Sequence, residues 1–307
     1  MRALVVTNMY PSARARARGS FVRDQVEALR RIPGVEVELF AFEPGGGSPY
    51  VRAARELRRR YGNARFDVVH AHFGLTAWPA LALRGMPRVV TLHGTDLVHP
   101  ISRAVTLAAL PFLDVVATVS TSLARLVPRA LVRGRSAILP CGVNVERFRP
   151  IPRQAARRAL GLEETARYLL FPADPARPEK RYDRAREIAG ELPLLALRNV
   201  DPDEVPLWVN AADAVLVPSE RESFGLAVLE ALACEVPVIA TPVGIAPEVL
   251  PGVAGALCGS FEKTTWRSAV MGLLDHTDPR VPGRAVAEQY SAQRMAQRVV
   301  EAWQALQ

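Results

Sequence analysis

Cysteine and lysine are both scarce in this sequence. The chain of 307 residues includes three cysteines, Cys141, Cys234 and Cys258, whose spacing matches neither a zinc ribbon nor a paired redox motif. So few cysteines also exclude a disulfide scaffold and suit a reducing cytoplasm. Lysine occurs only at positions 180 and 263, so nearly all of the 39 basic residues are arginine. The net charge of +8 is therefore an arginine surplus.

The sequence also lacks a long uninterrupted apolar segment. Its longest apolar stretch, residues 104–124, contains Pro111 and Asp114, whereas a membrane-spanning helix needs about 20 uninterrupted apolar residues. The first apolar run ends in polar Thr7 and Asn8 without a cleavage site, so we expect a strand there and not a signal peptide. With 49% hydrophobic residues, the chain is long enough to form one large domain or two ordinary domains with cores.

Charge is distributed unevenly along the chain. Residues 1–150 carry a net charge of +12, and residues 151–307 carry a net charge of −4. Two interpretations of the basic half remain open: its arginines, Arg14, Arg16 and Arg18 among them, gather at an anionic membrane face, or they form an ordinary solvated surface. Nucleic acid is not an expected partner, because no cluster of stacking aromatic residues accompanies the arginines.

Short apolar runs alternate with longer amphipathic segments along the chain. This pattern is typical of parallel strands that are buried on both faces and joined by crossover helices, so the predicted fold class is α/β. The strands are expected at residues 3–6, 35–40, 68–71, 88–92, 115–119 and 137–139, and then at 168–171, 194–197, 214–217, 236–240 and 256–257. Helices fill the intervals, the first being residues 21–31 with Ser20 as its cap.

The strand series restarts after a proline-rich stretch. Pro150 and Pro152 interrupt any helix or central strand, which predicts a domain boundary between residues 150 and 151. Each domain is predicted to be a doubly wound, Rossmann-like sheet, and the two are expected to face a cleft. The expected parts are an N-terminal domain at 1–150, a second domain at 151–290, and a C-terminal helix at 291–307 that packs back across the first domain.

Ligands of open parallel sheets bind beyond the carboxyl ends of the strands, so the segments that follow strands are the candidate sites. In the N-terminal half, Gly19 precedes a helix, where a glycine lets backbone N–H groups approach an anion. His93 begins the segment HGTD after a buried strand. Each residue also has a structural interpretation: Gly19 allows a turn, and His93 forms part of a helix cap. His70 and His72 share one face of a strand but lack a third ligand, which favours packing over a metal site.

The acidic half contains the stronger candidates. Arg177 and Lys180 occupy a proline-rich loop that leads into a helix, where a bound phosphate would relieve the conflict between positive charge and the helix dipole. Glu222 stands just before another helix, and Glu230 lies within that helix among leucines. A carboxylate on an apolar helix requires donors, and the vicinal hydroxyls of a ribose are suitable. These residues predict a nucleotide diphosphate pocket.

Six motifs follow one another in the chain: GSFVRDQ, DVVHAH, VVTLHGTD, ILPCGVNVERFRP, ARPEKR and PSERESFGLAVLEALACEVPVIAT. The most specific piece is the pair Glu222 and Glu230 with the intervening FGL. This set resembles the retaining, family-four glycosyltransferases of the GT-B fold. The resemblance implies a metal-independent hexosyltransferase, without a cofactor, that moves a sugar from a UDP- or GDP-linked donor to an anionic, sugar or lipid-linked acceptor. It also fits a cytoplasmic enzyme at the inner face of the cell membrane.

The resemblance implies roles for individual residues. His93 and Glu222 would be catalytic, with His93 reaching the transferred sugar from the opposite domain. Arg14, Arg16 and Arg18 would lie on the acceptor side. The donor would be bound by Gly19, Arg177, Lys180, Ser223, Phe224, Gly225, Leu226 and Glu230. Fixed positive charge and helix amides would stabilise the leaving diphosphate without a metal.

The sequence departs from the family pattern at the phosphate-binding arginine, where Pro175 stands and Arg177 is the nearest substitute. The second domain is also short over residues 191–213. Asp201 and Asp203 fit a manganese-binding pattern of a different glycosyltransferase fold, but a helix cap is the preferred interpretation. Two other functions stay open: a nucleotide-sugar 2-epimerase, which would turn over without an acceptor, and a non-catalytic carbohydrate-binding relative.

Overall fold

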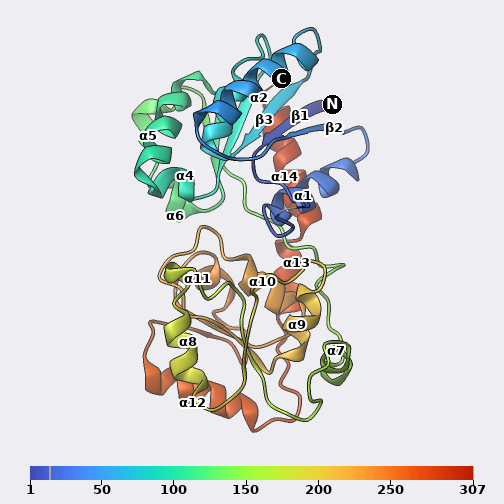
Figure 1. Ribbon diagram of the computed structural model, residues 1–307, viewed down its shortest axis with the longest axis vertical. Coiled ribbons are helices and arrows are strands. Elements are labelled where there is room, and N and C mark those ends of the chain that lie inside the picture. Colours follow the sequence, from blue (N-terminus) through green and yellow to red (C-terminus); the bar gives the residue numbers. More distant parts are fainter. Residues whose placement is uncertain (14, 307) are drawn as a thin grey trace. The chain divides into compact units, whose positions relative to one another are not determined.

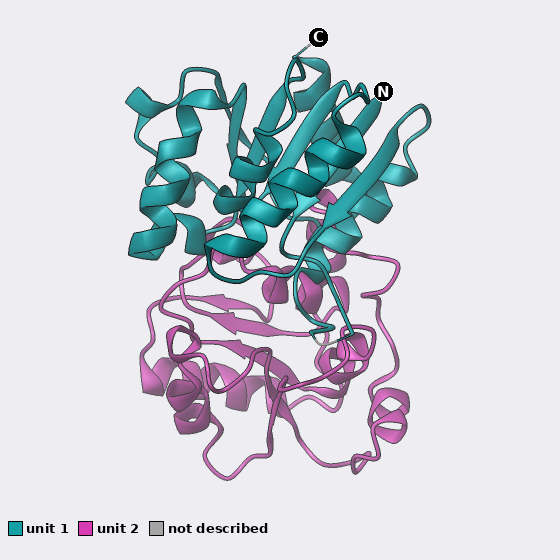
Figure 2. Cartoon of the chain, turned by 45° about the horizontal axis from the view of Figure 1, so that its top comes forward, with its two compact units in different colours: residues 1–142, 292–307 teal, residues 143–291 magenta. Residues whose placement is uncertain are grey.

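Two parallel sheets organise the computed structural model, which describes residues 1–13 and 15–306. Unit 1 contains Met1–Gly142 and the segment from Ala292 onward, and unit 2 contains Val143–Ser291 (Figures 1 and 2). The expected boundary after residue 150 comes too late. Residues 143–150 belong to unit 2 because the Val143 N–H donates to the Tyr290 carbonyl at 2.9 Å, and Arg284 holds the carbonyl of Phe148 at 3.2 Å.

The unit 1 sheet has six strands, all parallel, in the order β2-β1-β3-β4-β5-β6. The strands are β1 (Arg2–Thr7), β2 (Glu36–Ala41), β3 (Val68–His72), β4 (Arg88–Leu92), β5 (Val115–Thr118) and β6 (Arg135–Ile138). All six confirm the strands predicted from the apolar runs. Strand β5 is buried along its whole length, which explains its nearly continuous apolar run. Strand β3 is buried to the same extent although it includes His70 and His72.

Helices join the strands of unit 1, and α14 follows unit 2 in the chain. The longer helices are α1 (Ser20–Arg30), α2 (Gly47–Tyr61), α5 (Pro100–Ala109) and α14 (Ala292–Gln304), and the short ones are α3 (Ala77–Ala80), α4 (Thr95–Val98) and α6 (Thr121–Ala124). Helix α14 lies beside α1 and buries Met295, Val299 and Trp303 in the same core as Val22 and Val26 (Figure 1). The last segment of the chain therefore completes the core of the first unit.

The unit 2 sheet has five parallel strands in the order β11-β10-β9-β7-β8. The strands are β7 (Leu169–Phe171), β8 (Leu194–Ala196), β9 (Ala214–Val217), β10 (Val238–Ala240) and β11 (Leu257–Cys258). The helices are α7 (Arg153–Ala159), α8 (Tyr182–Ala189), α9 (Val205–Ala211), α10 (Leu226–Ala233), α11 (Ala246–Val249), α12 (Lys263–Leu274) and α13 (Arg284–Gln289). These strands confirm the second predicted series. Among the helices that the structure describes in either unit, none has the length and apolar character needed to span a membrane.

A buried carboxylate anchors the start of β9. Asp213 is fully buried, and its Oδ2 accepts hydrogen bonds from Arg157 Nη2 and from the Tyr168 backbone N–H, both at 2.8 Å. Arg153, itself buried, lies 3.5 Å from the other oxygen. Burial lowers the pKa of Arg153 to about 10, against the opposing effect of Asp213. The carboxylate thus ties α7 to the first strands of the unit 2 sheet.

Replacing Asp213 by Asn is expected to destabilise unit 2 by about 3–5 kcal/mol, because Arg157 stays buried without its counter-charge and Arg153 keeps only the half-exposed Asp278. Denaturant unfolding measures the effect, as the change in the free energy of unfolding of unit 2. The matched control is Asp275→Asn, because Asp275 is exposed, and it should change that free energy by less than about 0.5 kcal/mol. Equal effects of the two substitutions would show that the Asp213 cluster has no special role in stability.

Candidate active site

Two loops at the carboxyl edge of the unit 2 sheet bring Lys180 and Glu222 together. Lys180 ends the short 3₁₀ helix η4 (Pro178–Lys180) that follows β7, and Glu222 lies between β9 and α10. Lys180 Nζ donates to both carboxylate oxygens of Glu222 at 2.6 Å, and Ser219 Oγ donates to Oε1 at 2.8 Å. Only 13% of the Lys180 side chain and 9% of the Glu222 side chain are exposed. Because water scarcely screens the pair, it is a strong fixed dipole.

The two loops are joined by their backbones as well. The Glu220 N–H donates to the Glu179 carbonyl at 2.9 Å, and Arg181 forms an ion pair with the Glu220 carboxylate. Thr241, buried at the end of β10, donates through Oγ1 to the Ser219 carbonyl at 2.5 Å. The position of Glu222 is therefore set by bonds that reach it from three strand ends.

A close chain crossing fixes the remainder of the Glu222 loop. The Ile245 N–H donates to the Phe224 carbonyl at 2.7 Å. The preceding residue, Gly244, has φ +60°, and a Cβ atom there would lie 2.4 Å from the Phe224 oxygen and 2.8 Å from Glu222 Cβ. Only glycine allows this approach, because any side chain would push the Glu222 loop away.

Helix α10 begins directly after this loop. Its N-cap is Gly225, with φ 95° and no side chain to cap the helix, and the Val228 N–H donates to the Gly225 carbonyl at 3.1 Å. A helix N-terminus whose cap residue lacks a side chain is favourable for an anion. Ser223 and Phe224 precede the cap, and the Phe224 side chain is buried. Glu230 lies half-buried on α10 itself. The predicted donor residues Lys180, Glu222, Ser223, Phe224, Gly225, Leu226 and Glu230 thus lie on two adjoining segments of unit 2.

Arg177 does not join Lys180 and Glu222. Its guanidinium donates from Nε and Nη2 to Glu179 Oε1 at 3.0 and 2.8 Å, and 57% of the side chain is exposed. The helix cap expected at Asp201 and Asp203 is also wrong. The Asp201 carboxylate accepts the Asp203 N–H within a turn, and the N-cap of α9 is Glu204, without a side-chain bond. Within 1–13 and 15–306, no group of three His, Cys, Asp or Glu side chains is arranged to hold a metal ion.

In unit 1, His93 lies just beyond the carboxyl end of β4, and Asp96 holds the turn that carries it. The buried Asp96 carboxylate accepts the backbone N–H groups of His93 at 3.0 Å, Gly94 at 2.7 Å and Gly74 at 3.1 Å. Burial raises the pKa of Asp96, although these N–H groups oppose the shift. Burial also holds the pKa of His93 well below its usual value, so the imidazole is neutral near pH 7. Asp96 therefore holds the backbone of His93 in place, and burial keeps its ring neutral.

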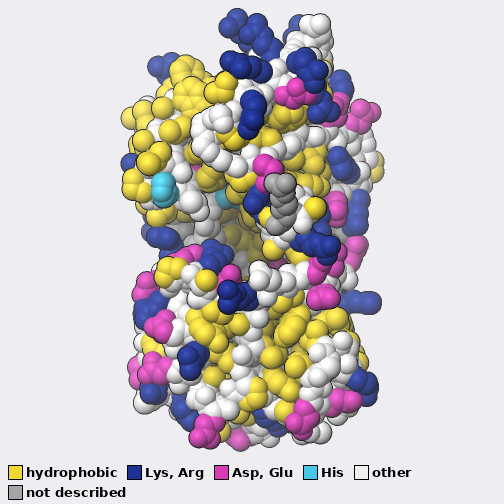
Figure 3. All heavy atoms as spheres, viewed as in Figure 1, with side chains coloured by type: hydrophobic (Ala, Val, Ile, Leu, Met, Phe, Trp, Pro, Cys, Tyr) yellow, Lys and Arg dark blue, Asp and Glu magenta, His cyan; other side chains and the backbone are white. Residues whose placement is uncertain are grey.

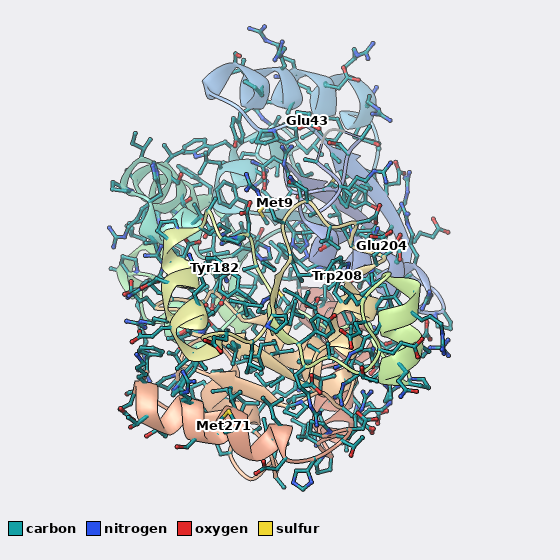
Figure 4. The ribbon with its side chains drawn as sticks, turned by 60° about the horizontal axis from the view of Figure 1, so that its bottom comes forward. Met9, Glu43, Tyr182, Glu204, Trp208 and Met271 are labelled. Carbon is teal, nitrogen blue, oxygen red and sulfur yellow. The ribbon has the colours of Figure 1, made fainter. Side chains whose placement is uncertain are left out.

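Gly19 lies at the same edge of the unit 1 sheet as His93. It is the N-cap of α1, with φ 62° and no side-chain cap bond, so the expected cap at Ser20 is wrong. A Cβ atom at Gly19 would lie 2.2 Å from the carbonyl oxygen of Met9, a residue labelled in Figure 4, so glycine is required by a chain crossing. Two residues later, the Phe21 ring packs 4.9 Å from the His93 ring. The start of α1 and the histidine are thus neighbours.

The predicted acceptor-side arginines are only partly described. Arg14 lies outside the described residues. Arg16 is exposed, and Arg18 forms an ion pair with Glu43, which follows β2 and is labelled in Figure 4. A pocket of about 630 Å³ opens beside Glu43, between the end of β2 and α2. Its basic lining residues are Arg52, Arg55, Arg59 and Arg60.

Comparison with known proteins gives a consistent result for both units. Residues 3–147 match the family model Glycosyltransferase Family 4, and residues 155–276 match Glycosyl transferases group 1. The chain belongs to the family-four glycosyltransferases. A D-inositol 3-phosphate glycosyltransferase of Thermobispora bispora is 29% identical to it, over 76% of this chain and 68% of that protein. One from Pseudarthrobacter chlorophenolicus is also 29% identical, over 84% of this chain and 73% of that protein.

Solved structures show that this glycosyltransferase has the GT-B fold. The sucrose-phosphate synthase of Thermosynechococcus elongatus superposes with a TM-score of 0.76 at 20% identity, covering 99% of this chain and 98% of that one. Anabaena HepE in complex with UDP-glucose gives a TM-score of 0.73 at 16% identity, covering 99% and 100%. Two Rossmann-like parallel sheets are the shared architecture, as the alternation of strands and helices predicts.

Sequence reasoning overlooked the residues that hold the site of this glycosyltransferase in place. Ser219 and Thr241 bind the Glu222 loop, and Gly244 lets that loop approach. A usable signal was present, since Ser219 and Thr241 each follow a strand closely, where the other candidates were sought. Asp96 is the last residue of the HGTD segment, for which the sequence offered only the interpretation of a helix cap.

Replacing Gly244 by Ala is expected to weaken nucleotide binding at least about tenfold, because the new Cβ displaces Phe224 and Glu222 from their positions. Isothermal titration with the nucleotide that binds the wild-type enzyme measures the change. Gly252→Ala is the matched control: Gly252 has φ +84°, but a Cβ atom there would meet nothing within 4 Å, so it carries the backbone strain without the collision. Retention of wild-type affinity in Gly244→Ala would mean that the crossing does not position the loop.

Proposed function

We propose that this enzyme is a retaining hexosyltransferase whose donor is a UDP- or GDP-linked sugar. The observation that carries the proposal is the Lys180–Glu222–Ser219 arrangement beside the N-terminus of α10. Helix N–H groups and a lysine suit a diphosphate, and a half-buried Glu230 on the same helix suits the hydroxyls of a ribose. The solved complex of HepE with UDP-glucose is consistent with a uridine nucleotide as one such donor.

The state of Glu222 supports transfer without a covalent enzyme intermediate. Lys180 donates hydrogen bonds to both carboxylate oxygens of Glu222, and Ser219 donates a further one to Oε1. The carboxylate is therefore poorly placed to act as a nucleophile. In the proposed step, the bond between the anomeric carbon and the diphosphate oxygen breaks while the acceptor oxygen bonds to that carbon from the same face. The acceptor proton passes to the departing diphosphate. Lys180 and the α10 amides stabilise the negative charge that develops there, in place of a metal ion.

The donor proposal predicts a selective thermal shift. Among UDP, GDP, ADP and their common sugars, one nucleotide series should raise the Tm of the protein by several degrees at concentrations near 100 times the Kd. Glu230→Ala should lose most of this shift, because the ribose loses its acceptor. Glu191→Ala, at an exposed position, should keep it. The shift should also persist in EDTA. A response to no nucleotide, or one that requires added Mn²⁺, would contradict the proposal.

For the acceptor we propose a phosphorylated or otherwise anionic molecule bound by unit 1. The pocket between β2 and α2 supports this, since Arg52 and Arg55 form no ion pair with a described carboxylate, whereas Arg59 pairs with Glu56 at 2.7 Å. The pocket lies at the carboxyl end of β2, the edge that parallel sheets use for ligands. The relatives named D-inositol 3-phosphate glycosyltransferase also have a phosphorylated molecule in their names.

We further propose that unit 1 touches an anionic membrane at the cytoplasmic face. Five apolar side chains lie exposed around α5, and Figure 3 shows yellow hydrophobic atoms gathered there. They form the α5 patch, which consists of Trp78, Val98, Ile101, Val105 and Phe112. Ile101 is 72% exposed and Phe112 55% exposed. Residues 1–150 carry a net charge of +12. An apolar patch on so basic a unit fits an interface with anionic lipid, where each basic residue near the surface contributes about 1 kcal/mol to the binding free energy.

The α5 patch predicts binding to anionic vesicles. The wild-type protein should sediment with phosphatidylglycerol vesicles at low salt, and less so as added salt screens its arginines. The double substitution Ile101→Ser and Phe112→Ser should reduce the bound fraction at least about threefold, because it removes exposed apolar area that the lipid would cover. Met271→Ser is the control, since Met271, labelled in Figure 4, is an exposed apolar residue on α12 of unit 2. An unchanged bound fraction in the double variant would contradict the membrane proposal.

A further inference from the structure

Three histidine rings are stacked within unit 1. His70 and His72 lie on β3, and His93 follows β4. The rings of His70 and His72 have centroids 4.5 Å apart and planes inclined by 24°, and those of His72 and His93 are 5.3 Å apart and inclined by 23°. His70 and His72 are fully buried, and His93 is half-buried. His93, for which the family resemblance implies a catalytic role, is therefore the outer member of a buried stack.

The proton of the innermost ring has one possible position. Trp303 Nε1, which can only donate, lies 3.2 Å from His70 Nδ1, so this nitrogen must accept. A neutral imidazole carries a single N–H, which then resides on Nε2 and donates to Thr91 Oγ1 at 2.8 Å. Both nitrogens of His70 are thus occupied, and none is left to bond with His72.

The middle ring has one bonded and one unbonded nitrogen. His72 Nδ1 lies 3.1 Å from His93 Nε2. Its Nε2 is buried and has no hydrogen-bond partner among the residues that the structure describes. Burial lowers the pKa of His72 to about 4 and holds the pKa of His93 well below its usual value. Both rings are therefore neutral near pH 7, and each has one proton to place.

Two placements satisfy the contact between these two rings. If His93 donates from Nε2, the proton of His72 must sit on its own Nε2, as a buried N–H group without an acceptor. If His72 donates from Nδ1, its Nε2 is left as a bare lone pair instead. Unpaired N–H groups are the rarest orphans in protein interiors, whereas unused acceptors are tolerated somewhat more often. The second placement is therefore favoured.

We propose that His72 is a positioning residue that donates Nδ1–H to His93 Nε2 and so fixes the single proton of His93 on Nδ1. His93 then has no free lone pair on its ring. It serves the substrate as a neutral hydrogen-bond donor and cannot act as a base. This assignment rests on the proposed sugar transfer and on the catalytic role that the resemblance implies for His93, and it agrees with a step in which the acceptor proton leaves with the diphosphate.

The groups that surround His93 fit this role. Asp96 uses its carboxylate on backbone N–H groups, including that of His93 itself, and the Phe21 ring covers the imidazole at 4.9 Å. Neither residue supplies an alternative ring partner. The hydrogen bond from His72 is therefore the described contact that distinguishes one nitrogen of His93 from the other.

Nitrogen NMR of the full-length protein labelled with ¹⁵N-histidine tests the assignment directly. At neutral pH, His93 should show a protonated Nδ1 and an unprotonated, hydrogen-bonded Nε2, and His72 should show the same tautomer. Signals are assigned by comparison with single-histidine substitutions. A proton on Nε2 of His93, or an imidazolium at pH 7, would overturn the proposal without reference to any activity.

Two substitutions separate positioning from packing. His72→Phe keeps a ring in the stack but removes the donor, so His93 should become a mixture of tautomers, and kcat for nucleotide release from the donor sugar should fall at least about tenfold with little change in KM. His72→Asn places an amide N–H near the former Nδ1 and should recover much of the loss. Equal losses in both variants would indicate a structural role and overturn the proposal.

The controls keep this test apart from that of the proposed function. The donor residues Lys180, Glu222 and Glu230 lie in unit 2, so His72→Phe should retain the nucleotide-induced Tm shift of the wild-type protein. If no nucleotide sugar binds the wild-type protein, the proposed function fails, whereas the tautomer of His93 is still decided by NMR. If the nucleotide binds but both His72 variants turn over at the wild-type rate, only the positioning role fails.

Discussion

Parallel pairing places the carboxyl ends of the six strands of unit 1 at one edge of its sheet, and it does the same for the five strands of unit 2. Residues far apart in sequence meet at these edges without any specific attraction between them. Ser219, Glu222 and Thr241 become neighbours because β9 and β10 end side by side, and His72 meets His93 because β3 and β4 do. The chemistry of both edges depends on this shared strand direction.

The Lys180–Glu222 pair shows how the unit 2 edge is prepared for an anion. A charge buried alone is costly to remove from water, whereas two opposite charges in contact offset part of that cost. Held together at 2.6 Å, they form a polar group whose geometry is already set before a ligand arrives. Preset geometry of this kind reduces the reorganisation needed when charge develops on a leaving group.

Sequence alone located the strands of both described sheets, since most of them are buried and their apolar runs stand out from the helices. It also singled out Glu222, Lys180 and His93 as candidates, because each follows a strand. The residue that each of these side chains contacts could not be predicted from the sequence. Arg177 pairs with Glu179, a neighbour two residues away, instead of extending toward Glu222. Gly244 owes its importance to a crossing with Phe224, a contact between segments twenty residues apart that no local pattern encodes.

The tie between Trp303 and His70 spans 233 positions of the chain. During synthesis, β3 leaves the ribosome long before α14 exists, so the nascent first unit lacks the indole that completes its core and orders its innermost histidine. Unit 2, whose residues are continuous in the chain, can reach its own structure during that interval. The order of folding in the cell is thus expected to be the reverse of the order of translation, with the amino-terminal unit closing last.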